Sequence, residues 1–301
     1  MKTMTLPLVS LLLLGAGSTA LAGTPINQSR DVDASVRIEI SNVRGSVTVS
    51  GWDQNRVEIT GTLGSGSKGL RVEGNGSRLE IEVEKPGSSG WFNWGSSSKM
   101  DDSTLDIRAP RGAELHIDTV SAEVTVSEIA GRLLDVNSIS GKIRLDSAAR
   151  ELEIGSISGS VELKGNGERV QVDTISGDIE FSANRDRLKF ETVSGNITVS
   201  TETYREFSAS SVSGDINLRG KPVGDARIDT ETMSGDIRIE AVGELSARIE
   251  AETFSGRIRS DFGKVQEPDH GPGRSIDATV GDGKARLSID TFSGDISIRR
   301  D

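Results

Sequence analysis

Residues 152–163 read LEIGSISGSVEL and residues 170–181 read VQVDTISGDIEF, and these two segments decide the fold. In each segment, apolar and polar residues alternate on both sides of a Ser-Gly dipeptide. This alternation is typical of two half-buried β-strands joined at a corner. Ile154 and Val161 are separated by seven residues, so both can face inward only if the chain bends between them. We place the bend at Gly159, because glycine tolerates a positive φ and the close approach of another backbone.

The Ser-Gly corner recurs along most of the chain. The spacings between successive serines are 18, 18, 18, 19, 21, 21 and 38 residues. A fixed period of this size is the mark of one supersecondary unit stacked on copies of itself. The corner glycines, to which we assign a structural role, are Gly141, Gly159, Gly177, Gly195, Gly214, Gly235, Gly256 and Gly294.

Each repeat is predicted to be one coil with two strands and two corners. The seven-residue separation of Leu163 and Val170 places a second corner at residues 165–167. Because the chain always travels the same way round, successive coils should stack in parallel and align like residues in ladders. We expect apolar ladders to shelter each coil on its neighbour, as in other repeat arrays. The sequence therefore predicts an all-β fold, a parallel β-solenoid with short two-strand coils of about 18–21 residues.

Three ladders follow from the alignment of the repeats. Isoleucine or valine stands two places after the glycine, at Ile143, Val161, Ile179, Ile197, Ile216, Ile237, Ile258 and Ile296. Threonine or serine stands two places before the Ser-Gly serine, at Ser138, Ser156, Thr174, Thr192, Ser211, Thr232, Thr253 and Thr291. An aliphatic or aromatic residue lies between, at Ile139, Ile157, Ile175, Val193, Val212, Met233, Phe254 and Phe292.

The ends of the chain suggest further organisation. Residues 1–22 resemble a secretory signal peptide, with a lysine at the start, a short apolar run and a small-residue cleavage site. Residues 23–34 are expected to form a polar leader, and residues 35–301 a single solenoid domain. Residues 38–49 already match the repeat, with Asn42 in place of threonine and Gly45 at the corner. Insertions are expected at 85–103 and 260–274, and residues 281–284 as a hairpin turn or a wide coil.

Composition limits the function. The chain has no cysteine, which excludes disulfides and thiolate metal sites, and we expect no cofactor. Its net charge of −11 argues against binding to nucleic acid or to anionic lipid. After the leader the sequence contains no hydrophobic run long enough to span a membrane. We therefore expect an exported protein, in the periplasm or at the cell surface of a bacterium.

The corners also indicate a family. The Thr-x-Ser-Gly-Asp-Ile segments at 174–179, 232–237 and 291–296, together with VRGSVTVSGWD at 43–53, resemble the DUF4097 family of bacterial adhesin-like proteins. The resemblance covers nearly all of the chain after residue 22. It implies a β-solenoid in the bacterial envelope, and it implies no catalytic residues. An adhesin-like role in this family is an inference from architecture.

Two chemical alternatives can be stated. Asp178, Asn196, Asp215, Asp236 and Asp295 share one corner position and could line a Ca²⁺-dependent scaffold, although aspartate after glycine is also ordinary turn chemistry. A carbohydrate-active enzyme would need two suitably spaced carboxylates on one face. His116 and His270 lie in no recognisable motif, so we assign no catalytic and no metal-binding residue.

One loop is a candidate for recognition. Trp91, Phe92 and Trp94 lie in a Gly/Ser-rich segment, where exposed rings could stack on sugars or anchor at an interface. The same rings could instead cap an open end of the solenoid. The predicted function is therefore non-enzymatic: an extended surface for an envelope protein or a glycan.

Overall fold

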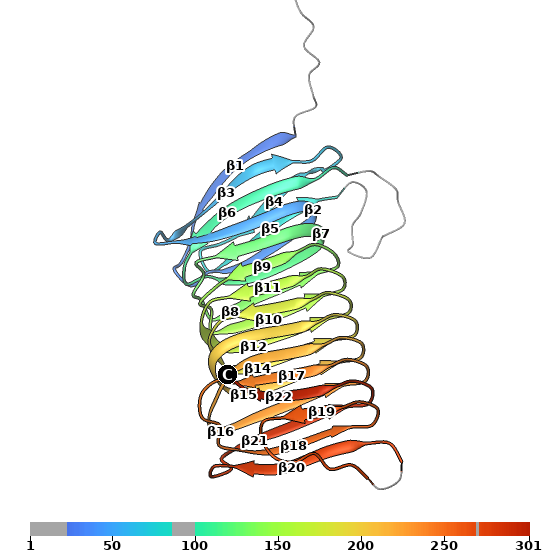
Figure 1. Ribbon diagram of the computed structural model, residues 1–301. Coiled ribbons are helices and arrows are strands. Elements are labelled where there is room, and N and C mark those ends of the chain that lie inside the picture. The colour runs from blue at the N-terminus through green and yellow to red at the C-terminus, as the bar shows by residue number, and fades with distance from the viewer. Residues whose placement is uncertain (1–22, 86–99, 269–270) are drawn as a thin grey trace, which may run out of the picture.

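The computed structural model describes residues 23–85, 100–268 and 271–301. These residues form 22 β-strands, and no helix occurs in these three ranges. The strands belong to one continuous sheet that winds into a tall, flattened coil (Figure 1). The prediction of an all-β parallel solenoid is confirmed.

Each coil has two faces. We call face 1 the strands that lead into the Ser-Gly corner and face 2 the strands that leave it. In the middle of the stack, face 1 is formed by β8 (Leu133–Ser138), β10 (Glu151–Ser156), β12 (Gly167–Thr174) and β14 (Arg185–Thr192). Face 2 is formed by β9 (Ile143–Asp146), β11 (Val161–Lys164) and β13 (Ile179–Ser182). The longer strands β15 (Ile197–Ser211) and β16 (Ile216–Thr232) run from face 2 of one coil to face 1 of the next.

The coils stack in parallel and in register. On face 1, Leu152 lies opposite Leu134 on one side and Val170 on the other. On face 2, Val161 lies opposite both Ile143 and Ile179. The ladder of residues two places after the glycine is buried throughout, with exposed fractions of 0–6%. Ile154 and Val161 are likewise both buried, so the bend between them brings apolar residues of both faces into one core.

The second corner also lies where the sequence places it. Gly165 has a φ of 93°, a conformation that favours glycine. Arg185 lies across this corner and is 2% exposed. Its guanidinium donates hydrogen bonds to the carbonyl oxygens of Ser147, Ala149, Arg150 and Arg169. Burial lowers the pKa of Arg185 to about 10. The buried cation thus satisfies backbone acceptors of two neighbouring coils.

The order of coils differs from the sequence at the C-terminal end. The last repeat, β21 (Ala285–Thr291) and β22 (Ile296–Arg300), inserts between two earlier coils. On one side it pairs with β16 and β17 (Ile237–Ala241), and on the other with β18 (Ala247–Thr253) and β19 (Ile258–Ser260). In Figure 1, β22 accordingly lies between β17 and β19. Strand β20 (Arg274–Val280) pairs antiparallel with β18 and closes face 1.

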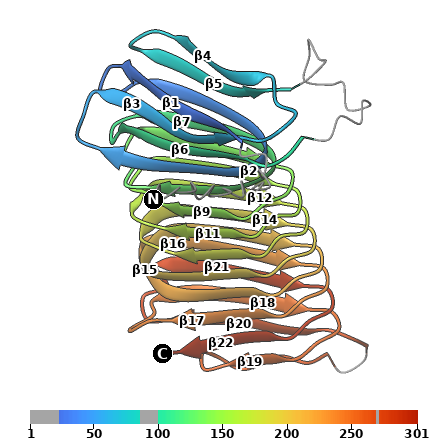
Figure 2. The same ribbon diagram turned by 90° about the horizontal axis from the view of Figure 1, so that it is seen from above.

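The N-terminal end shows the same displacement. The first repeat, β2 (Arg37–Trp52), lies in parallel against β7 (Glu114–Ser127). The residues between them in the sequence form the outer layer: β5 (Arg78–Glu84) and β6 (Ser103–Pro110) pair with the other side of β2. Antiparallel strands then complete this end, namely β4 (Gly69–Gly74) on β5, β3 (Arg56–Leu63) on β6, and β1 (Thr24–Asp31) on β3. Figure 2 shows β4 and β5 at one extremity of the molecule and β19 and β20 at the other.

The sequence predicts three segments outside the regular coils: residues 23–34, 260–274 and 281–284. Residues 23–34, expected as a polar leader, contain strand β1. Residues 281–284 are neither a hairpin nor a wide coil, because β20 and β21 lie on opposite sides of β18. The turn there carries the chain past the start of β18, and the amide of Asp282 donates to Ser246 Oγ at 3.0 Å. The range 260–274, expected as an insertion, includes the last residue of β19, Ser260, and the first residue of β20, Arg274.

Candidate functional site

An exposed apolar column, which we call the corner ridge, is the most unusual surface of the described chain. It consists of the residues between the corner threonine or serine and the Ser-Gly dipeptide. In stacking order they are Ile139, Ile157, Ile175, Val193, Val212, Met233, Phe292 and Phe254, with exposed fractions of 38–61%. The expectation that this ladder shelters inside the coil is therefore wrong. Of the two apolar ladders that flank the corner, the one two places after the glycine is buried and the ridge is not.

Strand parity explains the exposure. Ile154 and Ser156 both point inward, so the next residue, Ile157, must point outward. The same alternation holds at every corner, because the threonine or serine before the ridge residue is buried in each coil. The outward position of the ridge residues could therefore be predicted from the sequence by counting along the strand. Their apolar character favours the opposite interpretation, burial in the core.

The buried hydroxyls hold the corner. Ser156 Oγ accepts from the amide of Gly159 at 3.0 Å and donates to the carbonyl oxygen of the same residue at 3.1 Å. Thr174 Oγ1 donates to the carbonyl oxygen of Gly177 at 3.1 Å. These bonds satisfy backbone groups that the sharp turn removes from the strand ladder. The ridge side chains therefore project from a rigid support.

The corner glycine is required by close stacking. A Cβ on Gly159 would lie 1.9 Å from the carbonyl oxygen of Gly141, and one on Gly177 would lie 2.1 Å from that of Gly159. Among the eight corner glycines only Gly141, with a φ of 134°, lies in the left-handed region. Of the two properties of glycine that suit a corner, Gly159 uses the close backbone approach and not a positive φ. Adjacent corners, and hence adjacent ridge residues, sit as near as backbones allow.

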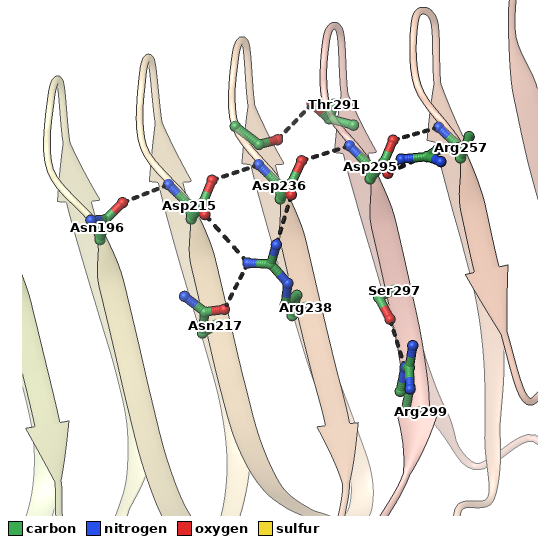
Figure 3. A network of polar contacts seen from close by, with 11 residues as sticks. Asn196, Asp215, Asn217, Asp236, Arg238, Arg257, Thr291, Asp295, Ser297 and Arg299 are labelled. Atoms are coloured by element: carbon green, nitrogen blue, oxygen red, sulfur yellow. Dashed lines mark hydrogen bonds and ion pairs between the residues drawn. The ribbon is translucent and has the colours of Figure 1, made fainter.

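The corner aspartates form a structural ladder (Figure 3). The side chain of Asn196 accepts the amide of Asp215 at 3.0 Å, Asp215 accepts that of Asp236 at 2.9 Å, and Asp236 accepts that of Asp295 at 2.9 Å. The series ends where Asp295 accepts the amide of Arg257 at 2.9 Å and pairs with its guanidinium at 2.7 Å. Each carboxylate therefore caps the backbone of the next coil.

These contacts bear on the calcium alternative. Hydrogen bonds from Arg257 hold the pKa of the Asp295 carboxyl below its usual range, as expected for a carboxylate already paired. No cluster of three or more His, Asp or Glu side chains suited to a metal ion occurs within 23–85, 100–268 and 271–301. The ladder instead favours the ordinary turn chemistry of aspartate.

A groove lies at the C-terminal end of the ridge. It has a volume of about 850 Å³, and Met233, Phe292 and Phe254 line it from three adjacent coils. The rings of Phe254 and Phe292 are stacked, with centroids 4.8 Å apart and planes inclined by 8°. Both rings are at least half exposed. Gln266, Pro268 and Ser275 also line the groove.

Carboxylates line the same groove. Glu231, Asp290 and Glu252 face outward immediately before the three buried threonines, and the register places them on neighbouring strands. Burial raises the pKa of the Asp290 carboxyl; its hydrogen bond with Ser288 opposes this, and the negative charges of Glu252, Asp229 and Glu231 raise it further. Among the described residues of the lining, Arg274 is the one basic side chain; it pairs with Glu267 at 2.7 Å and donates to the carbonyl oxygen of Gly256. The groove is thus apolar along one side and negative along another.

His116 lies far from the ridge's C-terminal groove, on β7. Its Nδ1 faces Asp135 Oδ2 at 3.2 Å, and its Nε2 faces Glu114 Oε1 at 3.2 Å. Both ring nitrogens are therefore occupied by carboxylates, which leaves neither to activate a serine. Burial alone would raise the pKa of Glu114, but hydrogen bonds from His116 and Arg132 lower it. The arrangement is an ion-pair network between adjacent coils.

The remaining candidates from the sequence lie outside the described residues. Trp91, Phe92 and Trp94, and also His270, fall in the ranges 86–99 and 269–270. Their assignment stays a prediction. The signal peptide at 1–22 is likewise outside the described part of the chain. Among the described residues, no helix is long and apolar enough to cross a membrane.

The stacked two-strand coils, the alternating burial and the glycine corners define a β-solenoid. Its family follows from a direct comparison: the family model Toastrack DUF4097 matches residues 35–299, so the chain belongs to the DUF4097 family. A search of curated proteins finds no match.

One solved structure supports the fold, and two more are similarities only. The chain resembles a protein from Parabacteroides distasonis named "Putative lipid binding protein", with a TM-score of 0.53, 15% identity, and coverage of 93% of this chain and 97% of that one. It also resembles a protein from Parabacteroides merdae named "putative adhesin", with a TM-score of 0.46, 11% identity, and coverage of 93% and 97%. A protein from Bacteroides fragilis, also named "putative adhesin", has a TM-score of 0.42, 12% identity, and coverage of 92% and 97%.

Proposed function

We propose that this protein is an exported, non-enzymatic binding protein of the bacterial envelope that presents its corner ridge to a partner, an adhesin-like role. The observation that carries the proposal is the ridge itself, eight exposed apolar side chains on eight consecutive coils. Soluble monomeric proteins rarely leave a contiguous apolar surface uncovered unless it binds something. An outward corner position could equally hold a polar residue, so eight apolar residues in one column favour a binding role.

The ridge suits an elongated partner. Its side chains repeat at the strand spacing of about 4.8 Å, so they form a straight, evenly spaced track. The corner hydroxyl bonds and the close glycine contacts hold this track rigid before binding, which lowers the entropic cost of association. Covering one half-exposed ridge residue would contribute roughly 1 kcal/mol from apolar burial. Affinity would therefore accumulate over several coils.

The non-enzymatic part of the proposal rests on geometry. The two ring nitrogens of His116 are held by carboxylates, and the column of corner aspartates is used in backbone capping. A glycan hydrolysis screen on the purified chain from residue 23 onward tests it directly. Turnover that one Asp or Glu substitution abolishes would overturn it in favour of a carbohydrate-active enzyme.

Site-specific crosslinking in the native bacterium tests the binding surface. A photoreactive phenylalanine derivative is placed at Val193 on the ridge and, as a matched control, at Thr198, which is exposed on face 2 of the same coil. We expect a discrete adduct from Val193 and none from Thr198. Equal labelling at both positions, or none at either, would contradict the proposal. Fractionation of the same cells should recover the protein outside the cytoplasm.

A triple variant separates recognition from folding. Ile157→Thr, Ile175→Thr and Val193→Thr remove apolar surface from three adjacent coils and keep a β-branched side chain at each position. The melting temperature should change little, because these residues are exposed. The adduct formed from a crosslinker at Val212 should disappear. Retention of that adduct would exclude the ridge as the binding surface.

A further inference from the structure

The C-terminal groove differs from the rest of the ridge in both shape and charge. Elsewhere the ridge residues are aliphatic and stand on a convex corner. In the last three coils they are Met233, Phe292 and Phe254, the largest of the series, and they line a groove of about 850 Å³ together with Gln266, Pro268 and Ser275. This volume falls in the range typical of small-molecule sites.

Two parallel columns run along this groove. One is apolar, formed by Met233 and the stacked pair Phe292 and Phe254. The other is anionic, formed by Glu231, Asp290 and Glu252. Both columns cross the strands at right angles and repeat at about 4.8 Å, so the outer carboxylates are about 9.6 Å apart. A ligand that fills the groove must match this linear pattern.

The anionic column has no internal counter-ion. None of its three carboxylates forms an ion pair with a basic side chain in the part of the chain that the structure describes, although Asp290 accepts a hydrogen bond from Ser288 Oγ at 3.3 Å. On face 1, Arg248 pairs with Glu250 at 2.9 Å and Asp277 at 3.5 Å, and Arg274, at the start of β20, pairs with Glu267 at 2.7 Å. Like charges on adjacent strands destabilise a sheet unless something neutralises them. A cationic ligand would supply that neutralisation.

We propose that the groove binds a linear aliphatic amine carrying two or more ammonium groups, with its ammonium groups on the carboxylate column and its methylene chain on the Met233–Phe292–Phe254 column. Such a molecule can lie along the groove between the two columns, with its ammonium groups turned toward the carboxylates and its methylene groups toward the apolar side chains. Ammonium groups next to the exposed aromatic faces gain further attraction from the ring electrons. A metal ion would leave the apolar column uncovered, and a neutral lipid would leave the carboxylates without partners.

The ligand of this groove is distinct from the partner proposed for the ridge. The groove uses three coils at one end, whereas the crosslinking test of the ridge uses coils near the middle. The two proposals can therefore fail separately.

Isothermal titration calorimetry with defined probes tests the proposal. The probes are 1,5-diaminopentane, spermidine, n-pentylamine and the neutral isostere 1,5-pentanediol, each titrated into the full chain from residue 23. We expect saturable binding with one site for the diamine and spermidine, at least tenfold weaker binding of n-pentylamine, and none of the diol. Equal binding of diamine and diol would overturn the proposal, and so would Mg²⁺ displacing the diamine at matched ionic strength.

Matched variants locate the site. The triple variant Glu231→Gln, Asp290→Asn and Glu252→Gln should weaken diamine binding at least tenfold. The control variant Asp173→Asn and Glu191→Gln changes the same strand position in coils that lack the groove, and it should bind like the parent. All these carboxylates are exposed or half-buried, so both variants should fold, which circular dichroism checks. A control variant that loses binding as strongly as the triple variant would show only non-specific attraction to a polyanion.

Substitution of the aromatic pair completes the test. Phe254→Ser with Phe292→Ser keeps every carboxylate and removes the apolar wall. Binding of the diamine should fall at least threefold, and the preference for diamine over n-pentylamine should remain. Unchanged diamine affinity in this variant would contradict the role assigned to the apolar column.

Discussion

The middle of the solenoid and its two ends obey different rules. Between Leu133 and Ala241 the coils stack in the order of the sequence, and the strands pair in register except for shifts between β15 and β16 near Ser200–Glu206. At both ends the order is broken: the first and last repeats lie one place inward, and the residues next to them in the sequence form the outer layer.

The difference shows what a local repeat can and cannot specify. Every repeat carries the same two strands, so each is compatible with many neighbours, and the stack alone does not fix where it stops. An exposed strand edge can template further pairing. At both ends the edge is covered by antiparallel strands that follow no repeat pattern. These are β4 and β1 at one end and β20 at the other. The terminal repeats, held inside the stack, fasten these outer strands.

Removal of the last repeat should have the largest effect. A chain ending at Lys284 lacks β21 and β22, the only strands of the described ranges that pair in parallel with β18 and β19. We expect residues 247–280 to lose their protection against amide hydrogen exchange, while residues 133–211 keep theirs. Hydrogen exchange followed by mass spectrometry measures both.

The matched control removes only Asp301, which pairs with Arg219. This exposed ion pair should contribute less than about 1 kcal/mol. If residues 247–280 remained protected in the longer deletion, the inserted position of the last repeat would be wrong.

Substitution of a buried isoleucine should destabilise the protein more in the middle of the stack than at its end. Ile179 has a neighbouring isoleucine or valine on both sides, whereas Ile258, in the last coil, contacts only Ile296 within its ladder. Ile179→Ala should lower the free energy of unfolding by about 4 kcal/mol and Ile258→Ala by about 2 kcal/mol. Chemical denaturation measures both. Ile175→Ala on the ridge serves as the exposed control, with a change within about 0.5 kcal/mol.

Substitution of a corner glycine should lower the free energy of unfolding by less than substitution of a buried isoleucine in the same region. A Cβ on Gly195 would lie 2.2 Å from the carbonyl oxygen of Gly177, and coils on both sides prevent relaxation. Gly195→Ala should therefore cost about 3 kcal/mol of unfolding free energy. The corresponding contact at Gly256 is 1.8 Å, but the last coil has one neighbour and can shift outward. Gly256→Ala should cost about 1 kcal/mol, and an equal loss at both positions would contradict this distinction.

The smallest expected effect is a pH-dependent change in the melting temperature when a single carboxylate is substituted. Burial and neighbouring carboxylates raise the pKa of Asp290 above its ordinary value of 3.8. The folded state therefore holds this proton more tightly than the unfolded chain, so ionisation of Asp290 destabilises the fold as pH rises through this window. Asp290→Asn should raise the melting temperature at pH 7, and this gain should disappear below pH 3.8.

Asp295 in the same coil provides the opposite case. Its pKa is lowered by hydrogen bonds from Arg257, so its ionised form stabilises the fold above the unfolded pKa, and the stabilisation is lost as pH falls through the folded pKa. Asp295→Asn should accordingly lower the melting temperature at pH 7. The same sign of change for both variants would contradict the assigned environments.

The sequence by itself determined the coil. Alternation fixed which residues of each strand point inward, the odd separation of Ile154 and Val161 fixed a corner between them, and the period fixed parallel stacking with aligned ladders. These features depend on residues close together in the chain, where sterics and strand pleating leave few choices. The same alternation also predicts that the ridge residues point outward.

Only the tertiary structure decided the order of coils at the ends and the existence of the groove. The last repeat matches every other repeat in its sequence, so nothing local distinguishes stacking beside β18 from stacking beyond it. That choice depends on which arrangement leaves the fewest strand edges unpaired, a property of the whole assembled chain. The insertion places Phe292 against Phe254, and Asp290 between Glu231 and Glu252, although these residues are far apart in the sequence.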